Sequence, residues 1–427
     1  MAHINALPVE LLQGLFELAL LEPTIISNSV CSIDSARHRR HLTIPLTLSY
    51  VCAQWRSITL STGLLWSSIV VLYRYYTPLE ISILTWQLKR AGNCPLNVTI
   101  DMAGLVDYPN ISRSWEFILN HLPQCETLIF PDIPTPVYRK IFPLRGPLPR
   151  LRRISIKPLA RITPSPSLPT PSIFEAPDSA TSLQSLHIDI PQIYMIDTVL
   201  FLTLTQLHLS NLEAGEREHA RLYNLMRDCA LLVDLHLSAP SGRGPLPYPS
   251  SPLFLPRLKS LSIQDCNLDK LLKSPSLQKL KCSSYHKEID RCHLPSIRQL
   301  HLLFSYEIDP SNLLWTPAAW THDVETLMVD ALPANLRSTL CTLQKYGEQH
   351  SDGRSKFQYL PHLKYLILES PKFPFTEEHA RNAVRELEAI LVARSNLRVR
   401  IIGIVLYLVG KQLSDLSTRV GGRLSSR

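Results

Sequence analysis

The stretch Leu204–Leu212, LTQLHLSNL, carries the hydrophobic frame L-x-x-L-x-L at Leu204, Leu207 and Leu209. In an extended strand successive side chains point to opposite faces, so positions four and six share one face and positions three, five and seven the other. The frame therefore predicts a short strand with buried leucines. The same frame, with other apolar residues in some places, begins at Cys125, Leu151, Leu183, Leu232, Leu258, Leu277, Ile297, Val324 and Leu363.

The spacing of these copies is typical of a repeat protein. They follow one another at roughly 26 residues on average, inside the window of leucine-rich repeats. The copy at 258–268, LKSLSIQDCNL, matches the full L-x-x-L-x-L-x-x-N/C-x-L signature of that class. A single repeat cannot bury its apolar side alone, so neighbouring strands stack in parallel and their outward residues line a concave face. We predict an irregular horseshoe with a parallel sheet on its concave face.

Two segments between or after the copies have helical patterns. In residues 213–232, EAGEREHARLYNLMRDCALL, the apolar residues Leu222, Leu225, Met226 and Cys229 recur at helical spacing. Residues 376–395, TEEHARNAVRELEAILVARS, begin with Thr376 as a potential N-cap, continue with acidic residues and have Arg394 near the end. A final apolar stretch, LRVRIIGIV, predicts a last strand. Together the second helix and this strand are expected to close the array.

Four histidines share one position of the frame. His187, His208, His236 and His301 all occupy the fifth, outward place, between residues that point inward. Such a row is poorly suited to metal binding, because ligands in line do not converge on one ion. Solvated strand histidines, a pH-sensitive surface and contacts with a partner remain alternatives. The candidate client-binding residues on the concave face are Arg153, His187, Gln206, His208, Asp234, His236, Lys281 and His301.

The first seventy or so residues do not follow the frame. Residues 7–20, LPVELLQGLFELAL, predict a helix with apolar residues on more than one face, so one face is available to a partner. Residues 45–62, PLTLSYVCAQWRSITLST, predict a second helix, and GLLWSSIVV closes the segment with Trp66. Between the helices lies a polar, basic loop. The pattern predicts a small helical domain ahead of the repeats.

These N-terminal residues resemble the F-box family. The family pattern of an LP-x-E-L-L opening, a V-C-x-x-W-R helix and a terminal L-W is present here as 7–12, 51–56 and 65–66. About twenty extra residues separate the first two pieces. The resemblance implies a substrate receptor whose helices dock on a Skp-type adaptor held by a cullin scaffold. The residues that it assigns to adaptor binding are Leu7, Pro8, Leu11, Leu12, Leu15, Phe16, Val51, Trp55 and Trp66.

What the resemblance implies for chemistry is proximity alone. The horseshoe would hold an unknown client protein near an activated thioester, with no catalytic group on this chain. An alternative is an interaction scaffold with an F-box-like fold that serves no ligase. A hydrolase that uses the histidine row is a third possibility, but no nucleophile stands beside His208.

Composition and motifs support a binding protein. Of 427 residues 45% are apolar and the net charge is +8, a diffuse excess with one cluster over Arg150–Arg161. We expect no nucleic-acid partner, because the basic residues are sparse and no reading motif accompanies them. The nine cysteines are scattered, and no signal peptide or membrane-spanning run is present, which indicates the cytoplasm or nucleus. Phosphate-binding, hydrolase and metalloprotease motifs are missing, so we expect no enzyme, metal or cofactor.

The expected fold class is α/β, a three-helix F-box followed by the leucine-rich-repeat horseshoe. The expected domains are the helical domain at 1–72, a linker or capping segment at 73–122, the solenoid with its cap at 123–410, and a tail at 411–427.

Overall fold

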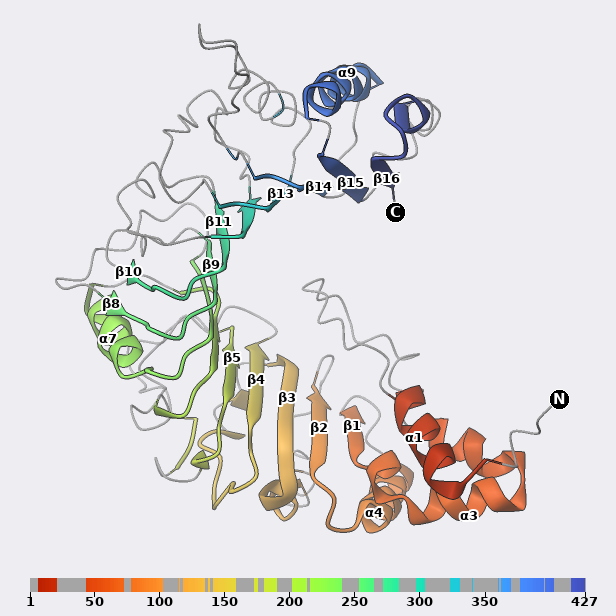
Figure 1. Cartoon of the computed structure of the whole chain (residues 1–427). Helices are drawn as coiled ribbons and strands as arrows, with labels where there is room; N and C mark the ends of the chain where they lie inside the picture. Colours follow the sequence, from red (N-terminus) through yellow and green to blue (C-terminus); the bar gives the residue numbers. More distant parts are fainter. Residues whose placement is uncertain are drawn as a thin grey trace, which may run out of the picture. The chain divides into compact units, whose positions relative to one another are not determined.

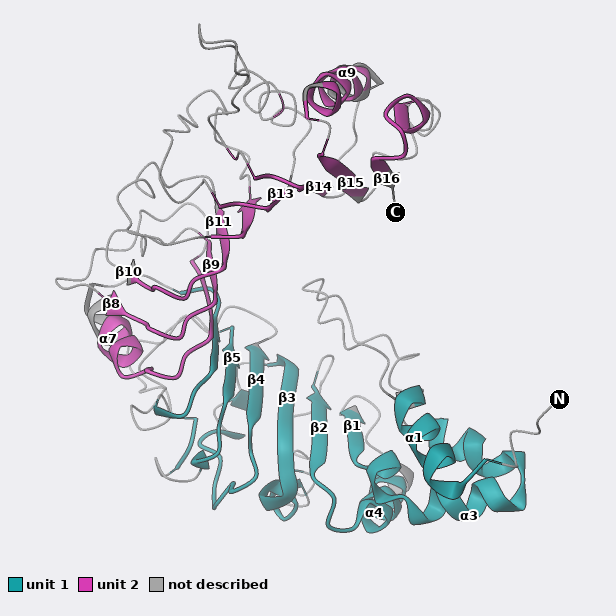
Figure 2. Cartoon of the chain, viewed as in Figure 1, with its two compact units in different colours: residues 1–212 teal, residues 213–427 magenta. Residues whose placement is uncertain are grey.

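The structure is a computed structural model of the whole chain (Figure 1). It describes residues 7–20, 44–72, 78–102, 115, 118–134, 137–138, 141–158, 173–175, 180–189, 202–212, 216–239, 253–264, 272–283, 297–303, 323–330, 340, 360, 362–369, 377–394, 396–402 and 416–426. Two compact units are distinguished, residues 1–212 and residues 213–427 (Figure 2). Neither predicted boundary, after residue 72 or after residue 122, coincides with this division.

Unit 1 begins with a helical module, defined here as residues 7–20 and 44–66. It contains helix α1 (Val9–Leu20), a helical stretch at 44–51, helix α3 (Ala53–Ser61) and the short 3-10 helix η2 (Gly63–Trp66). The second predicted helix, 45–62, is divided in two by Cys52, whose backbone is extended and whose Sγ accepts a hydrogen bond from Trp55 N at 3.5 Å. Cys52 is thus the N-cap of α3, and one continuous helix was a wrong prediction.

The core of this module is apolar and aromatic. Leu12, Leu65 and Trp66 have no exposed surface, and Phe16 is buried beside them. The Phe16 and Trp55 ring centroids are 4.8 Å apart, and Trp66 Nε1 donates to Thr59 O at 2.8 Å. A buried indole needs such an acceptor for its N–H group. The packing therefore fixes α1, α3 and η2 against one another.

The rest of unit 1 is a parallel sheet. Strands β1 (Ser68–Leu72), β2 (Leu96–Asp101), β3 (Cys125–Ile133), β4 (Arg153–Pro158), β5 (Ser185–Ile188) and β6 (Gln206–Leu209) pair in sequence order. Helix α4 (Pro78–Ala91) connects β1 to β2, and the 3-10 helix η4 (Leu122–Gln124) precedes β3. The segment 73–122, predicted as a linker or cap, thus supplies a strand to the sheet. The frame search missed β1 and β2.

Unit 2 contains the remaining elements. Helix α7 (Glu216–Arg227) precedes β7 (Asp234–Ser238), and helix α9 (Glu377–Ala393) precedes β15 (Arg398–Ile402). Two short strands, β8 (Leu253–Phe254) and β10 (Leu272–Lys273), pair apart from the main sheet. The main strands are ordered β7-β9-β11-β12-β13-β14-β15-β16, and every pair is parallel. The other strands are β9 (Ser260–Gln264), β11 (Lys279–Ser283), β12 (Gln299–Leu303), β13 (Thr326–Asp330), β14 (Tyr365–Glu369) and β16 (Leu424–Ser426).

The repeated frame accounts for most main strands of both units. Each of the ten copies coincides with a strand, and its first, fourth and sixth residues are buried. Within a unit the copies are in register: Leu186 pairs with Leu207, and Leu300 pairs with Leu327. These aliphatic rows are the apolar face that each strand shares with its neighbours. The predicted α/β class with a parallel sheet is therefore confirmed. The predicted tail, in contrast, contains β16, which pairs with β15.

Backbone hydrogen bonds repeat with the frame as well. The carbonyl of the second position accepts two N–H groups from the next copy: Gln184 O accepts from Thr205 N and from Gln206 N, both at 2.9 Å. The same arrangement recurs at Lys259 O in unit 2, which accepts from Gln278 N and Lys279 N. In these copies the first N–H groups of the strand are therefore satisfied by the preceding repeat.

The two helices predicted between or after the copies are present as α7 and α9. In α7 and the turn after it, Leu222, Leu225, Met226 and Cys229 are all buried, as predicted. Arg394 follows α9, and its guanidinium is buried; Nη1 donates to Leu360 O at 3.0 Å. Burial lowers the pKa of Arg394 to about 10. The predicted N-cap Thr376 lies outside the described residues. Within the described ranges, every helix is too short or too polar to cross a membrane.

Candidate protein-binding surfaces

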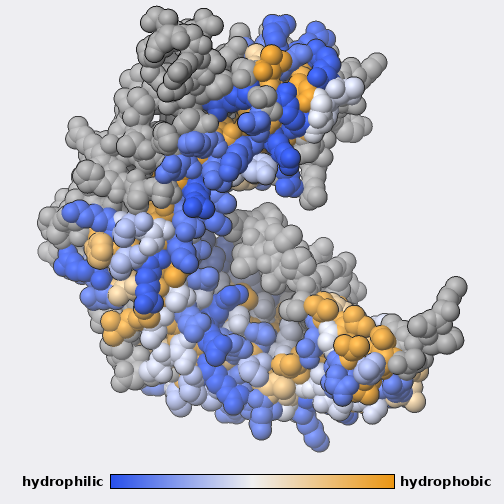
Figure 3. Space-filling view, viewed as in Figure 1, coloured by the Kyte–Doolittle hydropathy of each residue, from blue (hydrophilic) through white to orange (hydrophobic). Residues whose placement is uncertain are grey.

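Helix α1 has two apolar faces with different surroundings. Leu12 and Phe16 lie on the face that packs into the helical module. Leu11, Leu15 and Leu18 follow one another at helical spacing on another face, and they are 57%, 45% and 63% exposed. We call these three side chains the leucine stripe. Figure 3 shows hydrophobic surface gathered over the helical module. An apolar patch of this kind on the surface of a folded module indicates a contact surface.

The nine residues assigned to adaptor binding fall into two groups. Pro8, Leu11, Leu15 and Val51 are exposed, and Leu7 and Trp55 are partly exposed. Leu12, Phe16 and Trp66 are buried, at 0%, 3% and 0% exposure. These three were misassigned as surface, because their side chains fill the interior where α1, α3 and η2 meet. Tyr50, which was not predicted, is 75% exposed beside Val51.

The predicted outward residues of the frame do face away from the buried leucines. His187 and His208 are opposite one another on β5 and β6 and are half-buried, whereas their neighbours along each strand are buried. Arg153 and Gln206, at third positions, are exposed. In unit 2 the predicted residues Asp234, His236, Lys281 and His301 are half-buried on the same side of their strands.

Register separates the histidines of unit 2. His236 is opposite Ser262, Ser262 is opposite Lys281, and Lys281 is opposite His301. A serine and a lysine thus lie between the two histidines, so within this unit they do not form a row of rings.

In unit 1 the two histidines form a stacked pair. The His187 and His208 ring centroids are 3.8 Å apart with 11° between the planes, and His208 Nε2 lies 3.0 Å from Ser210 Oγ. Burial lowers the pKa of His187, with a smaller decrease from Lys157 and an opposing increase from Asp189. Because the two rings are stacked, their nitrogens lie side by side and do not converge on one ion. Among the described residues, no three His, Cys, Asp or Glu side chains are placed to hold a metal ion.

A polar cavity of about 370 Å³ lies at the amino ends of β2 to β6. Apart from Asn97 of β2, its walls are the second and third positions of neighbouring copies. Arg152 Nη1 lies 3.3 Å from Glu126 Oε1 within it. Sequence reasoning identified Arg153 and Gln206 here but overlooked the second positions, although these are polar in most copies. The lining residues are Asn97, Glu126, Thr127, Arg152, Arg153, Gln184, Ser185, Thr205 and Gln206.

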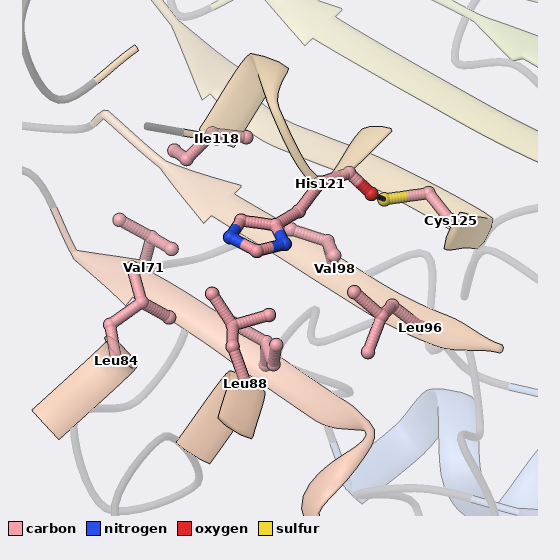
Figure 4. A pocket seen from close by; sticks show the side chains of 9 residues that line it. Val71, Leu84, Leu88, Leu96, Val98, Ile118, His121 and Cys125 are labelled. Atoms are coloured by element: carbon pink, nitrogen blue, oxygen red, sulfur yellow. Dashed lines mark hydrogen bonds between the residues drawn. The ribbon is translucent and has the colours of Figure 1, made fainter. Parts of the chain in front are cut away.

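A second cavity, between α4 and the start of the sheet, is apolar and small (Figure 4). It has a volume of about 20 Å³, which is room for roughly one water molecule. His121 and Cys125 lie in its wall among aliphatic side chains, and the Cys125 thiol donates to His121 O at 3.6 Å. Burial raises the pKa of Cys125 to about 12 and lowers that of His121. A thiol with this pKa is not a nucleophile at neutral pH.

The described residues thus offer two surfaces suited to partners: the leucine stripe with Tyr50 and Val51, and the outward sheet face with its polar cavity. Comparison of the chain with models of known protein families gives no match, and comparison with curated proteins gives none.

Proposed function

We propose that this chain is a substrate receptor of a ubiquitin ligase. The helical module is an F-box that docks on a Skp-type adaptor carried by a cullin, and the outward face of a leucine-rich-repeat horseshoe binds the client. The observation that carries the proposal is the leucine stripe, three neighbouring leucines about half exposed on a helix whose adjoining face, with Leu12 and Phe16, is buried.

Energetics favour a partner on this surface. Fully burying a leucine side chain contributes about 1.5–3 kcal/mol relative to leaving it in water. The stripe therefore has apolar surface left to bury after the module has folded. The exposed residues of the module also belong to the stretches that resemble the F-box family. Leu11 is part of the LP-x-E-L-L opening at 7–12, and Val51 is part of the V-C-x-x-W-R stretch at 51–56.

The outward face of the strands supplies a different kind of surface. Its residues carry both signs of charge together with amides, hydroxyls and imidazoles, which favours specific polar recognition. On this proposal the ligase acts by holding a client lysine near the activated ubiquitin. The chain itself supplies position and no reacting group.

Adaptor binding by purified components tests the proposal. Leu11→Asp combined with Leu15→Asp should weaken the affinity of the full chain for a Skp-type adaptor by at least about 100-fold, because each change places a charge against an apolar surface. The matched control is Leu202→Asp, since Leu202 is 57% exposed like Leu11 but precedes β6. Isothermal titration measures affinity, and circular dichroism verifies folding.

Two outcomes contradict the proposal. If the wild-type chain shows no affinity for any Skp-type adaptor, the helical module is that of an interaction scaffold without a ligase. If the stripe variant binds as tightly as wild type, the adaptor surface lies elsewhere.

A further inference from the structure

We infer that the polar cavity of unit 1 binds a carboxylate-bearing, acidic segment of a partner protein. This inference deepens the proposed function, because it names the chemistry of the client, and it rests on the outward face being the client surface. The test of this inference needs no adaptor, so the inference can fail while adaptor binding is retained.

The cavity has the extent of a peptide site. Its walls come from five neighbouring strands, β2 to β6. Adjacent strands are about 4.8 Å apart, so the lining spans roughly 19 Å across the sheet. The cavity volume of about 370 Å³ has space for several side chains of a segment that crosses the strands.

The charges in the cavity leave one cation available. Arg152 and Glu126 are paired with each other at 3.3 Å. Arg153 lies next to them, is exposed, and its side chain has no ion pair or hydrogen bond to another described residue. An arginine guanidinium is planar and matches a carboxylate with two parallel hydrogen bonds. The net charge of the lining, two arginines against one glutamate, is +1.

The other lining groups suit the same ligand. They are side-chain amides and hydroxyls, which can donate to carboxylate oxygens: Asn97, Thr127, Gln184, Ser185 and Gln206. The Thr205 hydroxyl instead donates to Gln184 O at 3.1 Å. The Arg152–Glu126 pair can open to a ligand at little cost, because its side chains are 60% and 34% exposed and exposed pairs contribute little. A carboxylate therefore has one free guanidinium and several neutral donors among the lining residues.

Charge along β4 orients the bound group. Arg153 is at the amino end of the outward side of the strand, followed by Ser155 and then Lys157. Farther along the strand, Lys157 interacts with the Asp132 carboxylate, whose pKa it lowers against the larger, opposite effect of burial. Positive charge thus remains unbalanced at the amino end, where the cavity lies. An acidic residue of the partner is drawn there, and a basic one is not.

A peptide array probed with the full-length chain tests this inference. The array holds twelve-residue peptides with two to four glutamates, each beside a twin with glutamine in place of glutamate and a twin with phosphoserine. The wild-type chain should favour glutamate peptides over their glutamine twins by about tenfold, the value of one charge-assisted hydrogen bond. In Arg153→Gln this preference should fall to about twofold or less.

The matched control is Arg398→Gln, because Arg398 is also exposed, on β15 in unit 2. It should leave the preference unchanged. Equal binding of the twins, no binding at all, or an undiminished preference in Arg153→Gln would overturn the inference. Stronger binding of the phosphoserine twins would show that the cavity prefers a phosphate, and the carboxylate inference would then be wrong. Adaptor affinity is measured on the same preparations, so loss of one property with retention of the other identifies which proposal fails.

Discussion

The helical module and the strand arrays use leucine in different ways. In the arrays the apolar residues of the frame are buried in every copy, because the next copy presents a matching row. In α1 leucines occupy both the buried face and the exposed leucine stripe. Repetition covers its own apolar surface, whereas a single helix with two apolar faces does not. A partner that binds apolar surface is therefore expected on α1, and a client that binds polar surface is expected on the outward residues of the strands.

The largest effect on this comparison is expected from a pair of leucine truncations, measured as the change in the free energy of unfolding. Leu207→Ala in β6 should lower the free energy of unfolding by about 2–5 kcal/mol, because it opens a cavity in a fully packed row. Leu11→Ala on the stripe should change it by no more than about 0.5 kcal/mol. Urea unfolding followed by circular dichroism measures both. Comparable losses in the two variants would mean that the stripe is part of the folded core.

Acidification should affect the strand array of unit 1. Burial lowers the pKa values of His187 and His121, so below about pH 6.5 the unfolded chain binds protons more readily than the folded chain. The contribution of these two histidines to stability is therefore constant above this pH and falls as the pH decreases. The slope from His187 is at most about 1.4 kcal/mol per pH unit, the limit for one proton.

Thermal unfolding between pH 7.5 and pH 5 measures this dependence. The double variant His121→Gln, His187→Gln should flatten the curve in that window. If the variant loses stability with falling pH as steeply as wild type, the two histidines are not the groups responsible.

The smallest expected effect concerns the break at Cys52. Serine is a stronger N-cap than cysteine, so Cys52→Ser should stabilise α3 by about 0.5–1 kcal/mol, and Cys52→Ala should not. Were residues 45–62 one continuous helix, the order would reverse, since serine is less favourable than alanine inside a helix. Thermal unfolding of the three chains distinguishes the two arrangements.

Much of the sheet could be predicted because its signal is periodic. All ten copies of L-x-x-L-x-L became strands, and the fifth-position histidines took the expected side. Strand β2 was missed because its apolar residues Leu96, Val98 and Ile100 alternate at a spacing of two, without the residue that would complete the frame. A register shift between Leu96 and Asn97 accompanies this difference. Strand β1 was missed because Trp66 occupies the first place of its frame and had been assigned to the helical module.

The candidate sites were predicted less completely. Four lining residues of the polar cavity, Glu126, Arg152, Gln184 and Thr205, precede the outward positions of their strands. An alternating pattern assigns no face to a residue at the bend before a strand, as Arg152, Gln184 and Thr205 are, and Glu126 is the second residue of β3. Likewise, helical spacing indicated two apolar faces on α1 but could not say which one Trp55 and Trp66 would cover.

By itself, the sequence determined the α/β class, the parallel strands and the inward and outward residues of each frame, because strand alternation is local and repeats. Only the tertiary structure decided which leucines of α1 stay exposed and that Arg152 pairs with Glu126 while Arg153 does not. It also decided that His187 and His208 stack, whereas His236 and His301 are kept apart by Ser262 and Lys281. These outcomes depend on which residues meet across chain segments, and that information is not contained in any one of them.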